Sequence, residues 1–205
     1  MEDAAAAGHP RPRVLVIGCG NLLRGDDGVG PECVRRLRQR GLPSDVGCTD
    51  GGTGGLDVAF EMRGVPEVIL VDACSSGSEP GSLFEVPGDE VADLAPPGGF
   101  HSHAFRWDHA LAWARSVLGE GFPAKVTALL VEGARYEVGT GLSPSVDHAV
   151  DRLVDILYAR IGATAVEVDA LKGRARGENR PRADATAAIT VAGDGGGRRV
   201  AGSGR

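Results

Sequence analysis

The chain has 205 residues, of which 42% are hydrophobic, and this suits one domain of ordinary size with a core of its own. The formal net charge is -6; residues 166–205 hold eight basic and five acidic residues, a net of +3, which leaves -9 on residues 1–165. That acidity excludes a surface built for nucleic acid, which needs Lys and Arg, and no stretch approaches the roughly 20 apolar residues of a membrane span.

The N-terminal residues 1–13 have no apolar segment of the signal-peptide type, which favours a cytoplasmic location. Four cysteines are present, and none of them form a C-x-x-C pair. We therefore interpret the cysteines as small buried side chains in a reducing compartment.

The first predicted unit is a strand, a loop and a helix. Residues 13–17 form a short β-branched run without polar alternation, which is typical of a strand covered on both faces. From Gly28 to Gly41 the pattern is that of an amphipathic helix, with apolar residues on one side and arginines on the other. The loop between them carries the candidate residues Gly18, Gly20, Asn21, Asp26 and Asp27.

The rest of the chain alternates between strand and helix patterns. In chain order we expect a strand at 46–49, a glycine-rich loop at 50–55, a helix at 56–63, a buried strand at 67–71, an edge strand at 82–86, a loop at 88–100, a helix at 104–118, a strand at 126–131 and a last helix opened by Ser143 and Pro144. This alternation predicts an α/β fold with a mostly parallel sheet. We expect a flexible leader at 1–12, one domain at 13–161, and a disordered tail rich in Gly, Ala and Arg at 162–205.

Reactive side chains follow several of these strands. Asp26 and Asp27 come after the first strand, Asp50 after the second, and Asp72 after the third, while His103 opens a later helix. Ligands of open α/β sheets bind at the carboxyl ends of the strands. Carboxylates and an imidazole on one rim suit a divalent cation with open positions, or the activation of a water for hydrolysis.

Each of these residues also has a purely structural interpretation. Asp26 and Asp27 could cap the first helix, Asp50 and Asp72 could form turns, and His103 could be an ordinary surface residue. A nucleotide-processing protein is a further alternative, but the third glycine of G-x-G-x-x-G falls at Leu23 and the dinucleotide fingerprint fails.

Taken together, the motifs resemble one known family. Residues 18–30 read G-C-G-N-L-L-R-G-D-D-G-V-G, and residues 50–56 read D-G-G-T-G-G-L. The likeness continues through V-I-L-V-D-A at 68–73, S-H at 102–103 and G-L-S-P at 141–144. Over about residues 13–160 the sequence is similar to the hydrogenase maturation proteases, the endopeptidases that trim the C-terminal extension of the [NiFe]-hydrogenase large subunit.

This resemblance implies a three-layer α/β/α sandwich around a twisted sheet of about five strands. It implies a metal-contacting trio of Asp27, Asp72 and His103, with Asp50 as an acidic loop residue suspected of a role in cleavage. His101 lies two residues before His103 and is not part of the family pattern, so it is a competing ligand. Asp26 is expected mainly to support the loop.

The resemblance also implies a partner and a metal. The partner is the hydrogenase large-subunit precursor, and the metal is the nickel of that bound precursor rather than a tightly held metal of the protein itself. We expect hydrolysis by a water that either a carboxylate or the metal activates, in a monomeric protein with no role for nucleic acid or membrane. The alternative within the same context is a module that delivers metal to the large subunit, or chaperones it, without cutting.

Overall fold

The structure, a computed structural model, describes residues 11–93, 107–162 and 190–191. The strands are β1 (Val14–Cys19), β2 (Val46–Gly52), β3 (Glu67–Ser75), β4 (Leu83–Pro87), β5 (Lys125–Glu132) and β6 (Thr190–Val191). The α-helices are α1 (Val29–Arg40), α2 (Gly55–Glu61), α3 (Gly88–Asp93), α4 (Trp107–Leu118) and α5 (Pro144–Gly162), with 3-10 turns η1 (Gly25–Gly28) and η2 (Gly119–Gly121).

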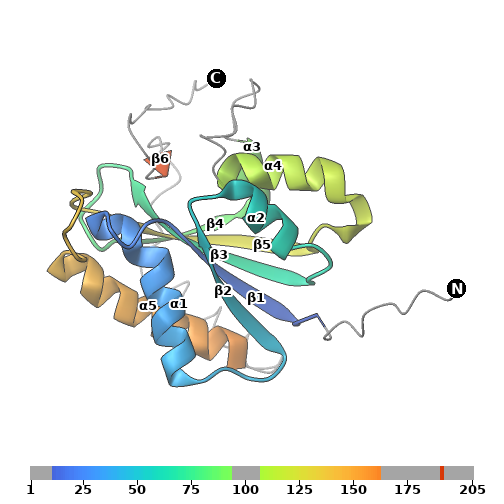
Figure 1. The fold of residues 1–205 in the computed structure, drawn as a ribbon, viewed down its shortest axis with the longest axis horizontal. Helices are drawn as coiled ribbons and strands as arrows, with labels where there is room; N and C mark the ends of the chain where they lie inside the picture. The colour runs from blue at the N-terminus through green and yellow to red at the C-terminus, as the bar shows by residue number, and fades with distance from the viewer. Residues whose placement is uncertain (1–10, 94–106, 163–189, 192–205) are drawn as a thin grey trace, which may run out of the picture.

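The five main strands form one twisted sheet in the order β2-β1-β3-β5-β4. Neighbours among β2, β1, β3 and β5 run parallel, and β4 pairs antiparallel with β5 at the edge. The short strand β6 pairs antiparallel with the end of β3. Helices α1 and α5 cover one face of the sheet and α2 and α4 the other (Figure 1), which confirms the predicted α/β/α sandwich.

Two apolar cores lie on the two faces of the sheet. In β3, Leu70 packs into the core beneath α2 and α4, and its neighbour Ile69 packs into the core beneath α1 and α5. Both side chains are fully buried. Because both faces of the strand are covered, its sequence is continuously apolar instead of alternating.

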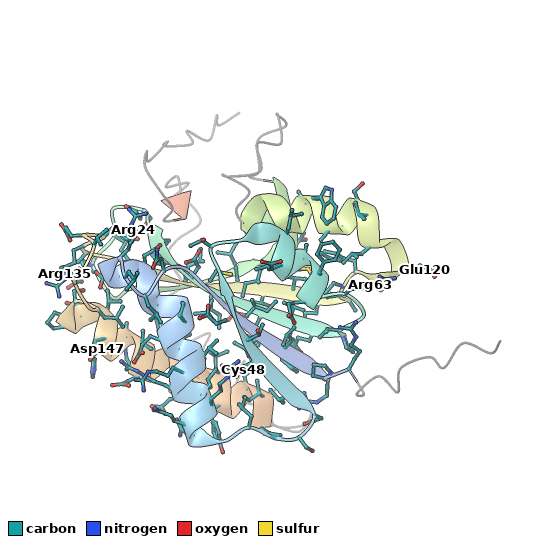
Figure 2. All side chains as sticks on the ribbon, viewed as in Figure 1. Arg24, Cys48, Arg63, Glu120, Arg135 and Asp147 are labelled. Carbon is teal, nitrogen blue, oxygen red and sulfur yellow. The ribbon has the colours of Figure 1, made fainter. Side chains whose placement is uncertain are left out.

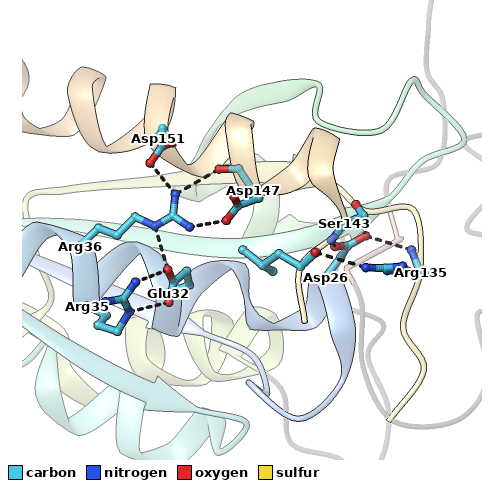
Figure 3. A network of polar contacts seen from close by, with 9 residues as sticks. Asp26, Glu32, Arg35, Arg36, Arg135, Ser143, Asp147 and Asp151 are labelled. Carbon is cyan, nitrogen blue, oxygen red and sulfur yellow. Dashed lines mark hydrogen bonds and ion pairs between the residues drawn. The ribbon is translucent and has the colours of Figure 1, made fainter. Parts of the chain in front are cut away.

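Helix α1 has the predicted boundaries and an ion-pair network on its outer side. Gly41 follows its last residue with φ of 84°, a conformation that suits glycine. Arg36 donates to Glu32 of the same helix at 2.8 Å and to Asp151 of α5 at 2.5 Å, and it also pairs with Asp147 (Figure 3). The network fixes α1 beside α5, and α1 begins directly after the loop that carries the candidate residues.

Two strands are longer than the sequence predicted. β3 continues from the predicted end at Val71 to Ser75, because β5 stays paired alongside it as far as Cys74 and Glu132. β2 continues into the predicted glycine-rich loop at 50–55, as far as Gly52. A methyl group on Gly51 would lie 2.8 Å from Ile17 Cγ2, so this glycine allows close packing within the strand and does not mark a turn.

The prediction of a loop at 88–100 was wrong for the first part of this segment, which forms α3. Val91 of this helix is buried in the core, and a methyl group on Gly88 would lie 2.6 Å from Val126 Cβ, so the helix packs closely on the sheet. The predicted helix at 104–118 is described from Trp107 onward. None of the helices in the described ranges is long and apolar enough to cross a bilayer.

Candidate functional site

The loop after β1 is packed tightly against the start of α1. A methyl group on Gly18 would lie 2.2 Å from the carbonyl oxygen of Gly30, and one on Gly20 would lie 1.9 Å from that of Asp27. Gly20 also has φ of 121°, where side chains are strained. A side chain at Gly18 would push α1 away from the sheet, and one at Gly20 would push η1 away, so the two glycines bring Asp27 onto the end of β1.

Asn21 closes this loop with three hydrogen bonds. Its backbone N–H donates to the carbonyl of Asp27 at 3.1 Å, and its carbonyl accepts the N–H of Arg24 at 3.0 Å. Its side-chain Oδ1 accepts the N–H of Leu23 at 2.9 Å. These bonds hold the backbone on both sides of η1, which is why an amide side chain suits this position.

Asp26 is fully buried and ties η1 to the segment before α5. Its Oδ2 accepts the backbone N–H groups of Ala134 and Arg135 at 2.8 and 3.0 Å and the Ser143 hydroxyl at 2.9 Å. Its Oδ1 accepts the Ser143 N–H at 2.6 Å (Figure 3). Arg135 lies at the same end of the molecule as Arg24 (Figure 2). Four donors therefore use the Asp26 carboxylate for structure.

Asp27 and Asp72 both lie beside Gly20, Asp27 through its backbone carbonyl and Asp72 through its carboxylate. Their exposed fractions are 3% and 2%. Asp72 Oδ1 accepts the N–H of Ala73 at 2.8 Å and lies 3.4 Å from the position that a methyl group on Gly20 would take. Asp72 was predicted at the end of its strand, but it lies within β3, one residue after the last pairing with β1. Asp72 lies at the carboxyl edge of the sheet because the neighbouring strand β1 stops pairing with β3 one residue earlier.

Asp50 lies on β2, beside the same loop, and it is exposed. Its Oδ1 accepts the N–H of Gly52 at 2.9 Å, and the carbonyl of Gly52 accepts the N–H of Gly20 at 2.9 Å. The side chain therefore both shapes the end of β2 and remains open to solvent. A carboxylate in this position is accessible to water at the edge of the loop.

His103 and His101 fall outside the described residues. Within the described ranges, no group of three His, Cys, Asp or Glu side chains is placed to hold a metal ion. The face of the sheet on which Asp72 projects does follow from strand alternation. Leu70 and Cys74 pack into the core beneath α2 and α4, so Asp72, which lies between them in β3, points to the same side.

A further buried carboxylate, Glu132, was not singled out from the sequence. It ends β5, is 2% exposed, and accepts the N–H groups of Ser76 and Gly77 and the Ser76 hydroxyl at 2.7–3.0 Å. The Cys74 thiol also donates to it at 3.5 Å. The signal was present, because an acidic residue directly follows the apolar run 126–131, as Asp72 follows its own run.

Comparisons with known proteins agree with this geometry. The hydrogenase maturation protease family matches residues 31–160. The chain is 32% identical over 160 residues to the hydrogenase 2 maturation protease of Escherichia coli, covering 76% of this chain and 94% of that protein. It is 30% identical over 159 residues to the hydrogenase expression/formation protein HupD of Rhodobacter capsulatus, covering 76% of this chain and 74% of that protein.

The fold agrees as well. The solved structure of the hydrogenase maturating endopeptidase HybD from Escherichia coli superimposes with a TM-score of 0.61 at 30% identity, over 72% of this chain and 91% of that one. The family match begins within α1 and runs through β2 to β5 into α5, so it includes Asp50, Asp72 and His103 and leaves out β1 and η1. The chain therefore belongs to the hydrogenase maturation protease family, and it is a peptidase.

Proposed function

We propose that this peptidase removes the C-terminal extension of a [NiFe]-hydrogenase large-subunit precursor after nickel has been inserted. The observation that carries the proposal is that two buried acidic residues, Asp27 and Asp72, meet at Gly20 at the carboxyl end of the central strands, Asp27 through its backbone carbonyl and Asp72 through its carboxylate. Ligands of open α/β sheets bind at the carboxyl ends of the strands, so both residues lie where a client would bind.

In this proposal Asp27, Asp72 and His103 contact the nickel of the client. Carboxylate oxygens and imidazole nitrogens both bind such divalent metals. Helix α4 begins at Trp107, four residues after His103, and it covers the face of the sheet toward which Asp72 projects. The client's nickel is then part of the substrate, and cutting depends on whether the metal has been loaded.

The chemistry is hydrolysis of one peptide bond. A water attacks the scissile carbonyl, gives a proton to a base, and the amine of the extension leaves after taking up a proton. Either a carboxylate or the nickel can activate this water, the metal by lowering the pKa of the water. Asp50 is the candidate carboxylate base because it is exposed beside the loop, whereas Asp26 is already engaged by four donors.

The test is a cleavage assay with nickel-loaded and nickel-free precursor, read by the mass of the large subunit's C-terminus. We expect the loaded precursor to be cut and the nickel-free precursor to stay intact. Asp27→Asn, Asp72→Asn and His103→Ala should each lower the rate by about 100-fold or more, which is the scale of losing one catalytic or metal-contacting group. Asp57→Asn, a change on the outer side of α2, is the matched control.

Three outcomes would contradict parts of the proposal separately. Full activity in all three site variants would contradict the assignment of Asp27, Asp72 and His103 to the site. Equal cutting of nickel-free precursor would remove the dependence on nickel. Binding of the precursor without any change in its mass would favour the alternative of a non-cleaving delivery or chaperone module. His101→Ala, measured in parallel, tells which of the two histidines contributes the imidazole.

A further inference from the structure

The edge of β3 that faces β1 is longer than β1 itself. Pairing between the two strands ends at Gly18 and Val71, but β3 continues to Ser75. Beyond that point β6 takes the place of β1, pairing antiparallel with Cys74 and Ser75 (Figure 1). The strand that completes this edge therefore comes from beyond residue 160, where the family match ends.

The direction of the backbone groups shows what this edge offers. The carbonyl of Cys74 accepts the N–H of Gly133, on the β5 side. Because successive residues of a strand direct their N–H and C=O groups to opposite edges, those of Ala73 and Ser75 face β6. The Ala73 N–H is already taken by the Asp72 carboxylate at 2.8 Å. Ser75 is thus the first residue after Asp72 whose backbone N–H and C=O can both pair with an added strand on this edge of β3.

We propose that this edge, Ala73 to Ser75, is where the client's extended C-terminal peptide binds, by adding to β3 as an antiparallel strand. In the absence of the client, β6 of the chain's own tail occupies the same edge and competes for it. Main-chain pairing supplies affinity without demanding a particular sequence, and it holds the peptide in an extended form that runs past Asp72. The inference rests on the proposed function, since it assigns that function a peptide-binding edge.

The pairing of β6 with β3 shows which substitution would break it. Thr190 lies opposite Ser75, and Val191 lies opposite Cys74. In an antiparallel pair, two directly opposite residues either exchange both backbone hydrogen bonds or exchange none. Because the backbone of Ser75 faces β6, the N–H of Thr190 points toward Ser75 and that of Val191 points away. Thr190→Pro therefore removes the donor that holds β6, and Ala185→Pro places the same residue in the tail outside β6 as the control.

The first measurement needs no client. Amide hydrogen exchange of Ser75 in the full-length protein should become about fivefold faster in Thr190→Pro, the scale of one lost hydrogen bond, and stay unchanged in Ala185→Pro. Unchanged exchange in Thr190→Pro would overturn the pairing of the tail. This result stands whether or not the client is cut, so it separates a failure of this inference from a failure of the proposed function.

The second measurement uses the nickel-loaded precursor. Thr190→Pro should lower KM by about fivefold at unchanged kcat, because the competing strand is gone. A synthetic peptide of residues 186–195 should inhibit Thr190→Pro competitively. The same peptide N-methylated at Thr190 should lose inhibition, and the one N-methylated at Val191 should keep it. Equal inhibition by both methylated peptides, or none by the unmodified one, would overturn strand addition at this edge.

Discussion

The carboxylate of Asp26 accepts the backbone N–H of Ser143 at 2.6 Å, although 117 residues separate the two. Ser143 immediately precedes α5, the last helix of the domain, and Asp26 lies in η1, directly before the first helix. The bond therefore joins the two helices of one face at their starts, where the candidate site lies. The same carboxylate accepts three further hydrogen bonds from this segment.

Asp26→Ala should lower the free energy of unfolding by about 3 kcal/mol or more, because it leaves several backbone N–H groups without an acceptor, each at a cost of about 1–3 kcal/mol. Urea unfolding followed by circular dichroism measures the change. Ser143→Ala is the matched comparison, since it removes only the hydroxyl bond and should cost about 1 kcal/mol. Equal midpoints for wild type and Asp26→Ala would contradict a supporting role for Asp26.

Two glycines with positive φ should respond differently to alanine. Gly20→Ala brings a methyl group to within 1.9 Å of the Asp27 carbonyl oxygen. A methyl group on Gly41 would have no atom within 4 Å, apart from its neighbours in the chain. We expect about 1 kcal/mol of destabilisation at Gly41 from backbone strain alone. At Gly20 the loss should be at least about 3 kcal/mol, with activity lost in whatever protein remains folded. Thermal melts of the two variants side by side test this contrast.

The four thiols should differ in reactivity. Cys19, Cys33 and Cys74 are buried, and burial raises the pKa of Cys33 to about 12 and that of Cys74 further. Cys48, on β2 (Figure 2), is only half-buried. At about pH 8 a thiol reagent should modify Cys48 first and the others only on unfolding, because the thiolate is the reactive form. Cys48→Ser should abolish the fast phase; a fast phase that survives it would contradict this order.

Stability should also depend on Glu32 at low pH. Its hydrogen bond with Arg35, followed by its bond with Arg36, lowers the pKa of this carboxyl below the ordinary value of 4.5. A lowered pKa in the folded state stabilises the protein above the unfolded pKa, and this contribution disappears as the pH falls through the folded pKa. Glu32→Gln should therefore be less stable than wild type near neutral pH by about 1 kcal/mol.

The stability difference between wild type and Glu32→Gln should narrow as the pH is lowered below 4.5. Urea unfolding at several pH values gives this difference directly. A difference that is constant from neutral to acid pH would contradict the ion-pair interpretation. Glu61→Gln, on α2 and away from this network, is a control for the general effect of removing one carboxylate.

The order of strands and helices could be predicted because the local signals agreed with each other. α1 begins and ends where Pro31 and Gly41 indicate, and α5 begins at Pro144 after Ser143. The two failures at strand ends have a common physical cause. Asp72 interrupts an apolar run and Gly51 has high flexibility, yet both lie in strands, because pairing with a neighbouring strand outweighs local propensity.

The acidic residues of the candidate site could be predicted from the sequence, but the contacts that hold them could not. Asp27, Asp50 and Asp72 follow apolar runs in the sequence, and the structure brings them to the surroundings of Gly20. The use of Asp26 could not be derived, since its donors come from residues more than one hundred positions away. The tail strand β6 was equally out of reach, because two residues in a glycine- and alanine-rich segment carry no strand pattern.

The Asp26–Ser143 bond has a consequence for the making of the protein. A ribosome releases the chain from its N-terminus, so Asp26 emerges long before Ser143 exists. Until the segment before α5 has been synthesised, the carboxylate of Asp26 lacks the four donors that hold it. We therefore expect a nascent or truncated chain that lacks Ser143 to be inactive as a peptidase.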